Sequence, residues 1–287
     1  MLTPDVRGKR RAWVTKLLAA CLLMFASITL NAAEKPIVIG LTPVFLDEQL
    51  SFLTRWEDYL ERKTGHPVRF VQRQSYREVT ELLLNGELDA AWLCGFPYIQ
   101  HRDKLVPLAV PLFNGEPLYR SYLIVGSTDT ATQSIDDLRD RIFAFSDPDS
   151  NSGYLVTQAG LRSQGLDANS FFHRSFFTWA HRNVVKAVAD GLADGGAVDG
   201  YVWEALAKID PELTSRTRVI QKSEQFGFPP FLTRINSQKN ALPLREALIS
   251  MATDPEGQIL LRELQLDGFT LSRPGLYQSI ANLAEQL

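Results

Sequence analysis

The sequence predicts an α/β protein with two lobes and a cleft between them. Short apolar runs alternate with segments of helical spacing across residues 36–94, and a second series of this kind covers residues 135–221. Extended apolar segments at 106–113, 118–125 and 226–233 join the two series. Alternation of strand and helix favours parallel-dominated sheets with helices on both faces. Two such series joined by extended crossovers indicate two lobes around a hinge of two crossover segments.

The first series begins with an apolar run at 36–41, which is typical of a buried strand. Apolar residues then recur at helical spacing over 46–63. Ser75 and Glu78 stand three residues apart, the spacing of a capping box, so a helix is expected over 75–84. The remaining expected elements of this part are strands at 68–71 and 89–94 and a turn at 95–98.

The second series contains a polar turn at 147–153 that opens a helix at 154–163. The other expected elements are helices at 135–139, 182–192, 242–251, 255–264 and 276–287 and strands at 142–145, 195–198 and 217–221. This order predicts one lobe from residues 34–120 with 226–287 and another from residues 121–225.

Residues 1–33 have the pattern of a cleaved secretory signal peptide. Basic residues gather before Lys16, fourteen mostly apolar residues follow at 17–30, and small residues stand at 31–33. As a helix, the apolar run would be about 21 Å long, which is short of the roughly 30 Å core of a bilayer. We therefore expect export to a bacterial periplasm, with the mature chain starting near Glu34.

The two cysteines bear on the leader and on redox chemistry. Cys21 follows Leu-Ala-Ala, which resembles a lipoprotein cleavage box, so lipidation at Cys21 stays open as an alternative. Removal of the leader leaves Cys94 alone, and no intramolecular disulfide can form. A single thiol in an oxidising compartment needs shelter or a use.

Charge and composition exclude several classes of function. The chain is 45% hydrophobic and 22% charged, an ordinary globular composition. It carries 30 basic and 33 acidic residues; five basic and one acidic residue lie within 1–33, so the remainder has 25 against 32 and a net charge of −7. A basic nucleic-acid footprint is absent. Any bound anion must therefore be held by local geometry.

A serine-rich turn is the best local signal for a ligand. Ser150, Asn151, Ser152 and Gly153 follow the expected strand at 142–145, and ligands of open α/β sheets bind beyond the carboxyl ends of strands. A helix N-terminus there would offer free amides, glycine would allow close approach, and the hydroxyls would add donors. An ordinary helix cap is the competing interpretation.

Five further residues stand near expected element ends. Tyr76 and Tyr98 could each present a phenol to the cleft, although tyrosines at such places usually pack with the hydroxyl at the surface. His181 starts a helix, where a neutral imidazole could donate to an anion. Asp199 and Tyr201 follow a short strand and could form a cleft wall, or serve as caps or loop residues.

Cys94 ends an expected strand and admits three interpretations. It is a small buried residue, a soft ligand that faces the cleft, or a nucleophile beside His181. The other histidines, His66, His101 and His173, have no spacing that predicts a metal site. The sequence predicts neither a metal nor a cofactor.

Several segments together resemble one family. The run at 147–156 resembles the anion-binding turn of the phosphonate/phosphite-type periplasmic substrate-binding proteins of ABC importers, and segments at 75–76, 89–98, 181 and 191–199 follow in that family's order. The resemblance implies a class II periplasmic binding protein fold that closes on its ligand. It also implies oxyanion contacts from Tyr76, Tyr98, Ser150, Asn151, Ser152 and His181.

Two departures from the family pattern concern the ligand. Members that hold an aminoalkyl phosphonate present acidic groups to the amine, and Tyr201 with its neighbouring glycines is a poor match for these. Some relatives that serve two-component sensors bind arsenite through a cysteine, an option that Cys94 keeps open.

We therefore expect a periplasmic solute-binding protein, not an enzyme, that captures phosphonate, phosphite or phosphate for an ABC permease in the inner membrane. A sensory binding protein that reports to a histidine kinase, including one that binds arsenite through Cys94, is the first alternative. A secreted thiol hydrolase that uses Cys94 and His181 is the second.

Overall fold

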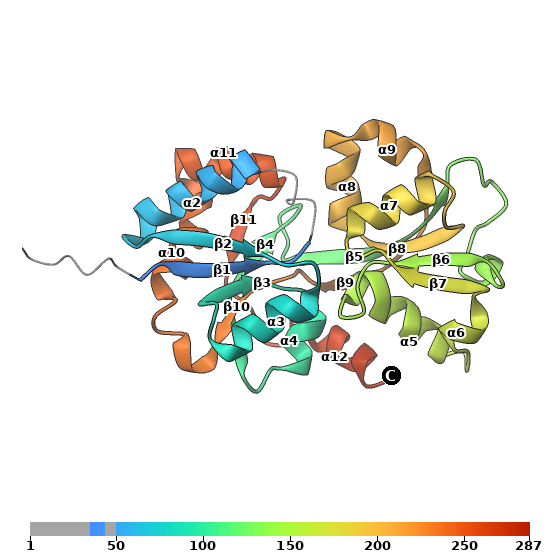
Figure 1. The fold of residues 1–287 in the computed structure, drawn as a ribbon, viewed down its shortest axis with the longest axis horizontal. Coiled ribbons are helices and arrows are strands. Elements are labelled where there is room, and N and C mark those ends of the chain that lie inside the picture. The colour runs from blue at the N-terminus through green and yellow to red at the C-terminus, as the bar shows by residue number, and fades with distance from the viewer. Residues whose placement is uncertain (1–34, 44–49) are drawn as a thin grey trace, which may run out of the picture. The chain divides into compact units, whose positions relative to one another are not determined.

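Two β-sheets organise the chain in the computed structural model, which describes residues 35–43 and 50–287 (Figure 1). Residues 36–287 form one unit that contains both sheets. The predicted signal peptide with Cys21, and the first four residues of the helix predicted over 46–63, lie outside the described residues.

The first lobe is built on a six-stranded sheet with the order β11-β4-β10-β3-β1-β2. Its strands are β1 (Ile37–Leu41), β2 (Val68–Gln72), β3 (Ala90–Trp92), β4 (Leu105–Leu112), β10 (Phe231–Arg234) and β11 (Gly268–Thr270). The second lobe has a five-stranded sheet with the order β7-β6-β8-β5-β9. Its strands are β5 (Leu118–Gly126), β6 (Ile142–Phe145), β7 (Arg174–Phe177), β8 (Gly195–Asp199) and β9 (Thr217–Gly227).

Both sheets follow the same plan. Each has a parallel set of three strands, β2-β1-β3 and β7-β6-β8, joined by helical crossovers. Beside each set lies an antiparallel strand that has just arrived from the other lobe, β10 in the first sheet and β5 in the second. The chain therefore changes sheet twice, between β4 and β5 and between β9 and β10. The lobe boundaries at 120/121 and 225/226 stay a prediction.

Helices cover both faces of each sheet, as predicted (Figure 1). The first lobe carries α2 (Leu50–Thr64), α3 (Tyr76–Asn85), α4 (Gly95–Gln100), α10 (Leu242–Ser250) and α11 (Pro255–Leu264). The second carries α5 (Val156–Arg162), α6 (Ala168–Phe171), α7 (His181–Ala189), α8 (Gly200–Ile209) and α9 (Pro211–Ser215). Short single-turn helices are η2 (Asp136–Leu138), η4 (Ile235–Ser237) and η5 (Met251–Thr253).

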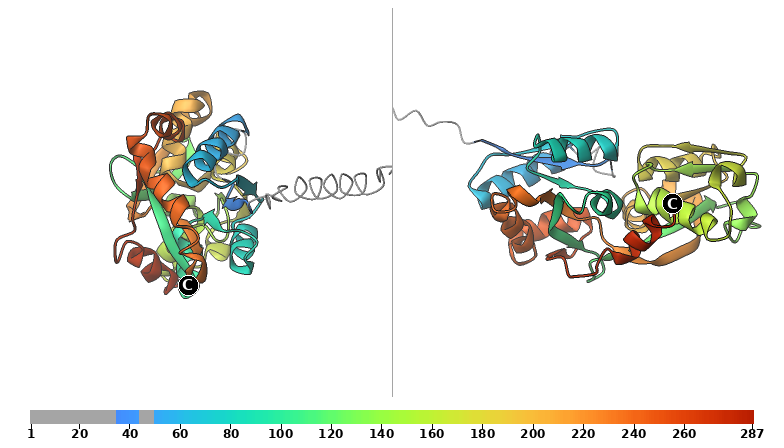
Figure 2. Two further views of the ribbon diagram at one scale, coloured as in Figure 1. Left: turned by 90° about the vertical axis from the view of Figure 1, so that its left-hand side faces the viewer. Right: turned by 90° about the horizontal axis from the view of Figure 1, so that it is seen from below.

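The C-terminal helix α12 (Gln278–Ala284) contacts elements of both lobes. It packs against α4 of the first lobe and against α5 and β9 of the second, and Figure 2 shows it beside α5. None of the described helices is long and apolar enough to cross a bilayer.

One local prediction was wrong, and several elements were missed, among them α6 and β7. The turn predicted at 95–98 is the start of α4, with Cys94 at its N-cap. Helices α8 and α9 were not predicted, because the alternation of Asp199 and Tyr201 was interpreted as the end of a strand, whereas Asp199 caps α8. Strand β11 was also missed, since three residues are too few to show a periodicity.

In each lobe an aspartate accepts a hydrogen bond from the first strand, in chain order, of the parallel set. The amide of Val38 in β1 donates to Oδ2 of Asp89 at 2.9 Å, and the amide of Ile142 in β6 donates to Oδ2 of Asp194 at 2.8 Å. Each aspartate stands just before the third strand of its parallel set and also donates its own amide back to the same residue. These carboxylates satisfy amides that the ladder would otherwise leave unpaired.

We expect Asp89→Ala to lower the free energy of unfolding by about 1–3 kcal/mol, because the Val38 amide loses a charged acceptor in a partly buried place. Urea unfolding followed by circular dichroism measures the change. Asp58→Ala, at an exposed position of α2, is the matched control and should leave stability within about 0.5 kcal/mol. Equal effects of the two substitutions would contradict the role given to Asp89.

Candidate ligand-binding site

A small closed cavity lies where the carboxyl ends of strands from both lobes meet. Its volume is about 20 Å³, somewhat more than the roughly 10–15 Å³ that one water molecule needs. Its lining residues come from both lobes and from the second crossover: Thr42, Tyr76, Trp92, Cys94, His181, Asp199, Tyr201, Val202, Phe228 and Pro229. Strand ends at a crevice are the usual ligand site of open α/β sheets.

The serine-rich turn forms the start of a helix beside this cavity. Ser150 is the N-cap of a π-helical turn, η3 (Asn151–Leu155), which continues into α5, and its Oγ accepts the amide of Gly153 at 3.0 Å. The predicted helix start is thus present three residues earlier than expected. Ser150 is used as a cap, while Asn151 and Ser152 stand in the first turn.

Direct contacts join the lobes around the cavity. The amide of Asn151 donates to Sγ of Cys94 at 3.2 Å, and the amide of Tyr76 donates to Oδ2 of Asp147 at 3.0 Å. At the rim, Nε of Arg77 lies 3.3 Å from a carboxylate oxygen of Asp149. The lobes are therefore in a closed arrangement at this site.

Three buried polar atoms near the turn make no hydrogen bond within the described chain: Oγ of Ser146, Oγ of Ser152 and Oδ1 of Asn151. All three residues are at most 1% exposed. Buried polar groups in folded proteins are nearly always paired, and an unpaired one costs free energy. The two serine hydroxyls are therefore available as donors, and the Asn151 amide oxygen as an acceptor, to a polar ligand or an ordered water.

Gly153 is required for this packing. A Cβ atom at this position would lie 1.8 Å from Oγ of Ser146, 2.7 Å from Cβ of Ser146 and 3.0 Å from Cε1 of His181. Because the backbone of the turn approaches both side chains so closely, only glycine fits. The turn, Ser146 and His181 thus belong to one site.

His181 is a neutral hydrogen-bond donor to the cavity. Its Nδ1 accepts the amide of Asp199 at 3.1 Å, so the ring carries its proton on Nε2. Burial lowers the pKa of His181 to about 3, and the ring stays uncharged at physiological pH. It stands at the first position of α7, where a cation would be disfavoured.

Asp199 has two functions at the cavity. Its Oδ1 caps α8 by accepting the amides of Tyr201 at 2.9 Å and Val202 at 3.4 Å. Burial raises the pKa of Asp199 to about 7, against the lowering effect of these amide hydrogen bonds. The carboxyl group is therefore partly protonated near neutral pH and can either accept or donate a hydrogen bond.

The other titratable groups of the site are also uncharged. Burial raises the pKa of Tyr76 well above its ordinary value, and that of the Cys94 thiol to about 11. Tyr119, on β5, accepts a hydrogen bond from Nδ2 of Asn151 at 2.9 Å and lies 3.9 Å from Sγ of Cys94. Cys94 is thus a neutral thiol at the site and not a thiolate nucleophile.

Most of the predicted site residues come together, and Tyr98 does not join them. Tyr98 lies outside the cavity: its ring packs 5.1 Å from that of Tyr277, and it lines a separate surface pocket. The reason is that α4 turns its side chain away from the cleft. Tyr201 lines the cavity, but its hydroxyl donates to the carbonyl oxygen of Leu264 at 2.6 Å.

Sequence reasoning missed Ser146 and Tyr119. Ser146 directly follows β6 and could have been found as a polar residue at a strand end. Tyr119 stands 32 residues before its partner Asn151, and no local signal marks it. The described part of the chain holds no group of three His, Cys, Asp or Glu residues that could bind a metal ion, and the described lining of the cavity includes no lysine or arginine.

Two lobes, two crossovers and a cavity at the strand ends define a class II solute-binding protein. Solved structures agree with this fold. A binding protein component of an ABC phosphonate transporter from Pseudomonas aeruginosa has a TM-score of 0.78 at 23% identity, over 88% of this chain and 86% of that one. PhnD1 from Prochlorococcus marinus, in complex with methylphosphonate, has a TM-score of 0.76 at 17% identity, over 88% and 98%.

The chain belongs to the family described as the phosphonate periplasmic substrate-binding proteins of ABC transporters, which matches residues 39–277. A phosphate-import protein, PhnD, of Mycolicibacterium smegmatis is 30% identical over 58% of this chain. A probable phosphite-binding protein of an ABC transporter, PhnD1 of Prochlorococcus marinus, is 22% identical over 54%. The match spans about half the length of each of these curated relatives, 55% in both cases.

We expect Gly153→Ala to lower the free energy of unfolding by about 1–3 kcal/mol, because the added methyl group overlaps the Ser146 side chain. Gly160→Ala is the matched control: Gly160 lies in α5, and a Cβ there has no neighbour within 4 Å. That substitution should raise stability by about 0.5–1 kcal/mol. Urea unfolding measures both, and a neutral Gly153→Ala would contradict the close packing of the turn.

We expect Asp199→Asn to make the protein more sensitive to acid. The raised pKa of Asp199 means that the folded state holds a proton that the unfolded chain releases, so acidification from about pH 7 to 4 stabilises the fold. The lowered pKa of His181 acts in the opposite direction below about pH 6.5. The two effects oppose each other in the wild type, and the asparagine variant keeps only the destabilising one.

Unfolding free energies of the ligand-free protein, measured in urea at several pH values between 4.5 and 7, test this expectation. The difference in unfolding free energy between variant and wild type should grow as the pH falls, with the slope that corresponds to the uptake of about one proton. Asparagine is also a good N-cap, so α8 should persist in the variant. Parallel stability curves for the two proteins would contradict the assignment.

Proposed function

We propose that this protein captures a small tetrahedral oxyanion of the phosphonate, phosphite or phosphate class in the periplasm and delivers it to an ABC permease. The observation that carries the proposal is the pair of buried, unpaired hydroxyls of Ser146 and Ser152 beside a neutral His181. These groups are donors without an acceptor, which is what the oxygen atoms of an anion supply. The predicted secretory leader and the family's periplasmic setting support the location.

Binding would depend on hydrogen bonds and not on a counter-ion. The donors available are two serine hydroxyls, Nε2 of His181 and the phenol of Tyr76, and all of them are neutral at physiological pH. Hydrogen bonds to a charged acceptor contribute roughly 1.5–3 kcal/mol each. Three or four of them compensate for removing the anion from water without a lysine or arginine in the site.

Asp199 supports an anion that still carries a proton. A partly protonated carboxyl can accept a hydrogen bond from an acidic O–H of the ligand, or donate one to an oxygen. A fully ionised Asp199 in the cavity wall would repel a dianion. The site therefore favours ligands that can carry either one or two negative charges near neutral pH. Phosphonate, phosphite and phosphate have this property near neutral pH, whereas sulfate does not.

Capture would proceed by closure of the lobes. Oxyanion contacts come from Tyr76 in the first lobe and from Ser152 and His181 in the second, so a ligand can bind all of them only when the lobes are together. A ligand shifts a conformational equilibrium by its differential affinity for the two states. The Arg77–Asp149 pair at the rim contributes little, because Arg77 is largely exposed.

The first test replaces one of the two serines whose hydroxyls have no hydrogen-bond partner within the described chain. We expect Ser152→Ala to weaken binding of methylphosphonate, phosphite or phosphate about tenfold or more, because one hydrogen bond to a charged oxygen is lost. Isothermal titration calorimetry measures the affinities.

Ser163→Ala, at the exposed end of α5, is the matched control and should bind like the wild type. Unchanged affinity of Ser152→Ala would remove this residue from the site. A wild-type protein that binds none of these anions would overturn the proposed function.

A further inference from the structure

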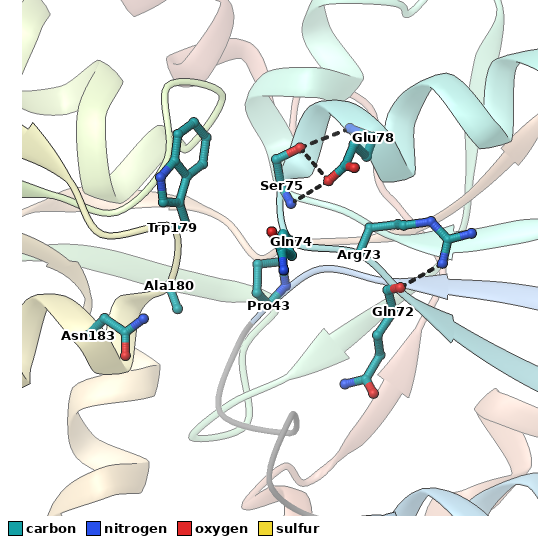
Figure 3. Close-up of a pocket in the computed structure, with 9 residues that line it drawn as sticks. All are labelled: Pro43, Gln72, Arg73, Gln74, Ser75, Glu78, Trp179, Ala180 and Asn183. Atoms are coloured by element: carbon teal, nitrogen blue, oxygen red, sulfur yellow. Dashed lines mark hydrogen bonds between the residues drawn. The ribbon is translucent and has the colours of Figure 1, made fainter.

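A second, larger cavity opens directly outside the proposed anion site. Its volume is about 660 Å³, within the roughly 300–1,000 Å³ typical of small-molecule sites. Its lining comes from the end of β2 and the start of α3 in one lobe and from the start of α7 in the other (Figure 3). We name it the outer cavity and define it by Pro43, Gln72, Arg73, Gln74, Ser75, Glu78, Trp179, Ala180 and Asn183.

The outer cavity and the anion site share a wall. At three places consecutive residues line the two spaces: Pro43 and Thr42, Ser75 and Tyr76, and Ala180 and His181. The same three segments therefore face the inner cavity with one residue and the outer cavity with the next. A group attached to an anion in the inner cavity would leave it across this wall.

Trp179 is held in the outer cavity at a conformational cost. Its side chain is 47% exposed, and its backbone has φ of 65°, a left-handed conformation that a bulky residue rarely adopts. The amide of Trp179 donates to the carbonyl oxygen of Ser146 at 2.6 Å, which fixes it directly beside the anion site. Strain of this kind concentrates at functional sites. Figure 3 shows Trp179 on one wall of the outer cavity and Ser75 and Gln74 on the other.

The described lining residues of the outer cavity carry one negative and one positive charge and so no net charge. Glu78 is the one acidic residue among its described lining residues, and its Oε2 already accepts the amide and the hydroxyl of Ser75, each at 3.0 Å. Arg73 adds a positive charge on the same wall. The remaining polar groups are the neutral amides of Gln72, Gln74 and Asn183.

We propose that the outer cavity binds the uncharged, planar substituent of a monosubstituted phosphonate or phosphate, which stacks on the indole of Trp179. This inference rests on the proposed function and narrows its ligand from inorganic oxyanions to organic ones with an aromatic or similar flat group. The anion is held in the inner cavity, and the substituent lies in the outer cavity against Trp179.

The experiment compares phenylphosphonate, methylphosphonate and 2-aminoethylphosphonate by calorimetric titration of the wild type, Trp179→Ala and Trp179→Phe. Stacking of one aromatic ring should make phenylphosphonate bind about five- to tenfold more tightly than methylphosphonate. Trp179→Ala should reduce that ratio to about twofold or less with methylphosphonate affinity retained, and Trp179→Phe should keep most of it. Leu192→Ala, at an exposed position of the same lobe outside the cavity, should leave the ratio unchanged.

The outcomes separate the two proposals. Binding of methylphosphonate with no preference for the phenyl compound, or a preference that Trp179→Ala leaves intact, would overturn the outer-cavity proposal alone. Tighter binding of 2-aminoethylphosphonate than of phenylphosphonate would do the same. Failure of all three compounds to bind to a protein that still binds phosphate or phosphite would overturn the outer-cavity proposal alone. Failure of phosphate and phosphite as well would overturn the proposed function.

Discussion

The proposed anion site depends on one constraint: its ligand would be held in a buried place whose described lining includes no lysine or arginine. Burial keeps Tyr76, Cys94 and His181 of the inner cavity neutral and leaves Asp199 partly protonated, which weakens electrostatic attraction and repulsion between these side chains and the ligand. The interaction then has to come from hydrogen-bond direction and number. This explains the residues found around the serine-rich turn. They are Gly153, the two serines whose hydroxyls have no partner, and His181 with its fixed tautomer. It also explains how a protein with an acidic mature chain can receive an anion.

The fold provides that geometry by repeating one sheet plan. In each lobe the parallel set of three strands ends at the same edge, and the chain crosses once in each direction to the antiparallel strand of the other lobe. Strand ends from two independent sheets thereby meet in one cavity. The repetition is topological: both lobes use an aspartate to pair the first strand of the set, although the sequence shows no repeat that would reveal it.

Much of this could be predicted from the sequence, because the strongest signals were local. Helix α3 with its capping box follows from Ser75 and Glu78, which stand three positions apart, and it is confirmed. The helix cap that competed with the anion-binding interpretation of the serine-rich turn is also present, at Ser150. The lobes and crossovers follow from the order of apolar runs. Side-chain direction could not be predicted where a helix replaced an expected turn, and Tyr98 on α4 therefore points to Tyr277. Partners such as Tyr119 and Asn151 are set by tertiary packing, which no periodicity records.

The contact between the Asn151 amide and the Cys94 sulfur crosses from one lobe to the other, and this has a consequence for the lifetime of the protein. In the closed arrangement the sulfur is buried beside the other lobe, and exposed thiols in an oxidising compartment are converted stepwise to sulfenic and sulfinic acids. An oxygen atom added to this sulfur would take up the space between Cys94 and Asn151 and hold the lobes apart. Oxidation of Cys94 should therefore accumulate in molecules that stay longest without a ligand, and a high ligand concentration should protect the protein from it.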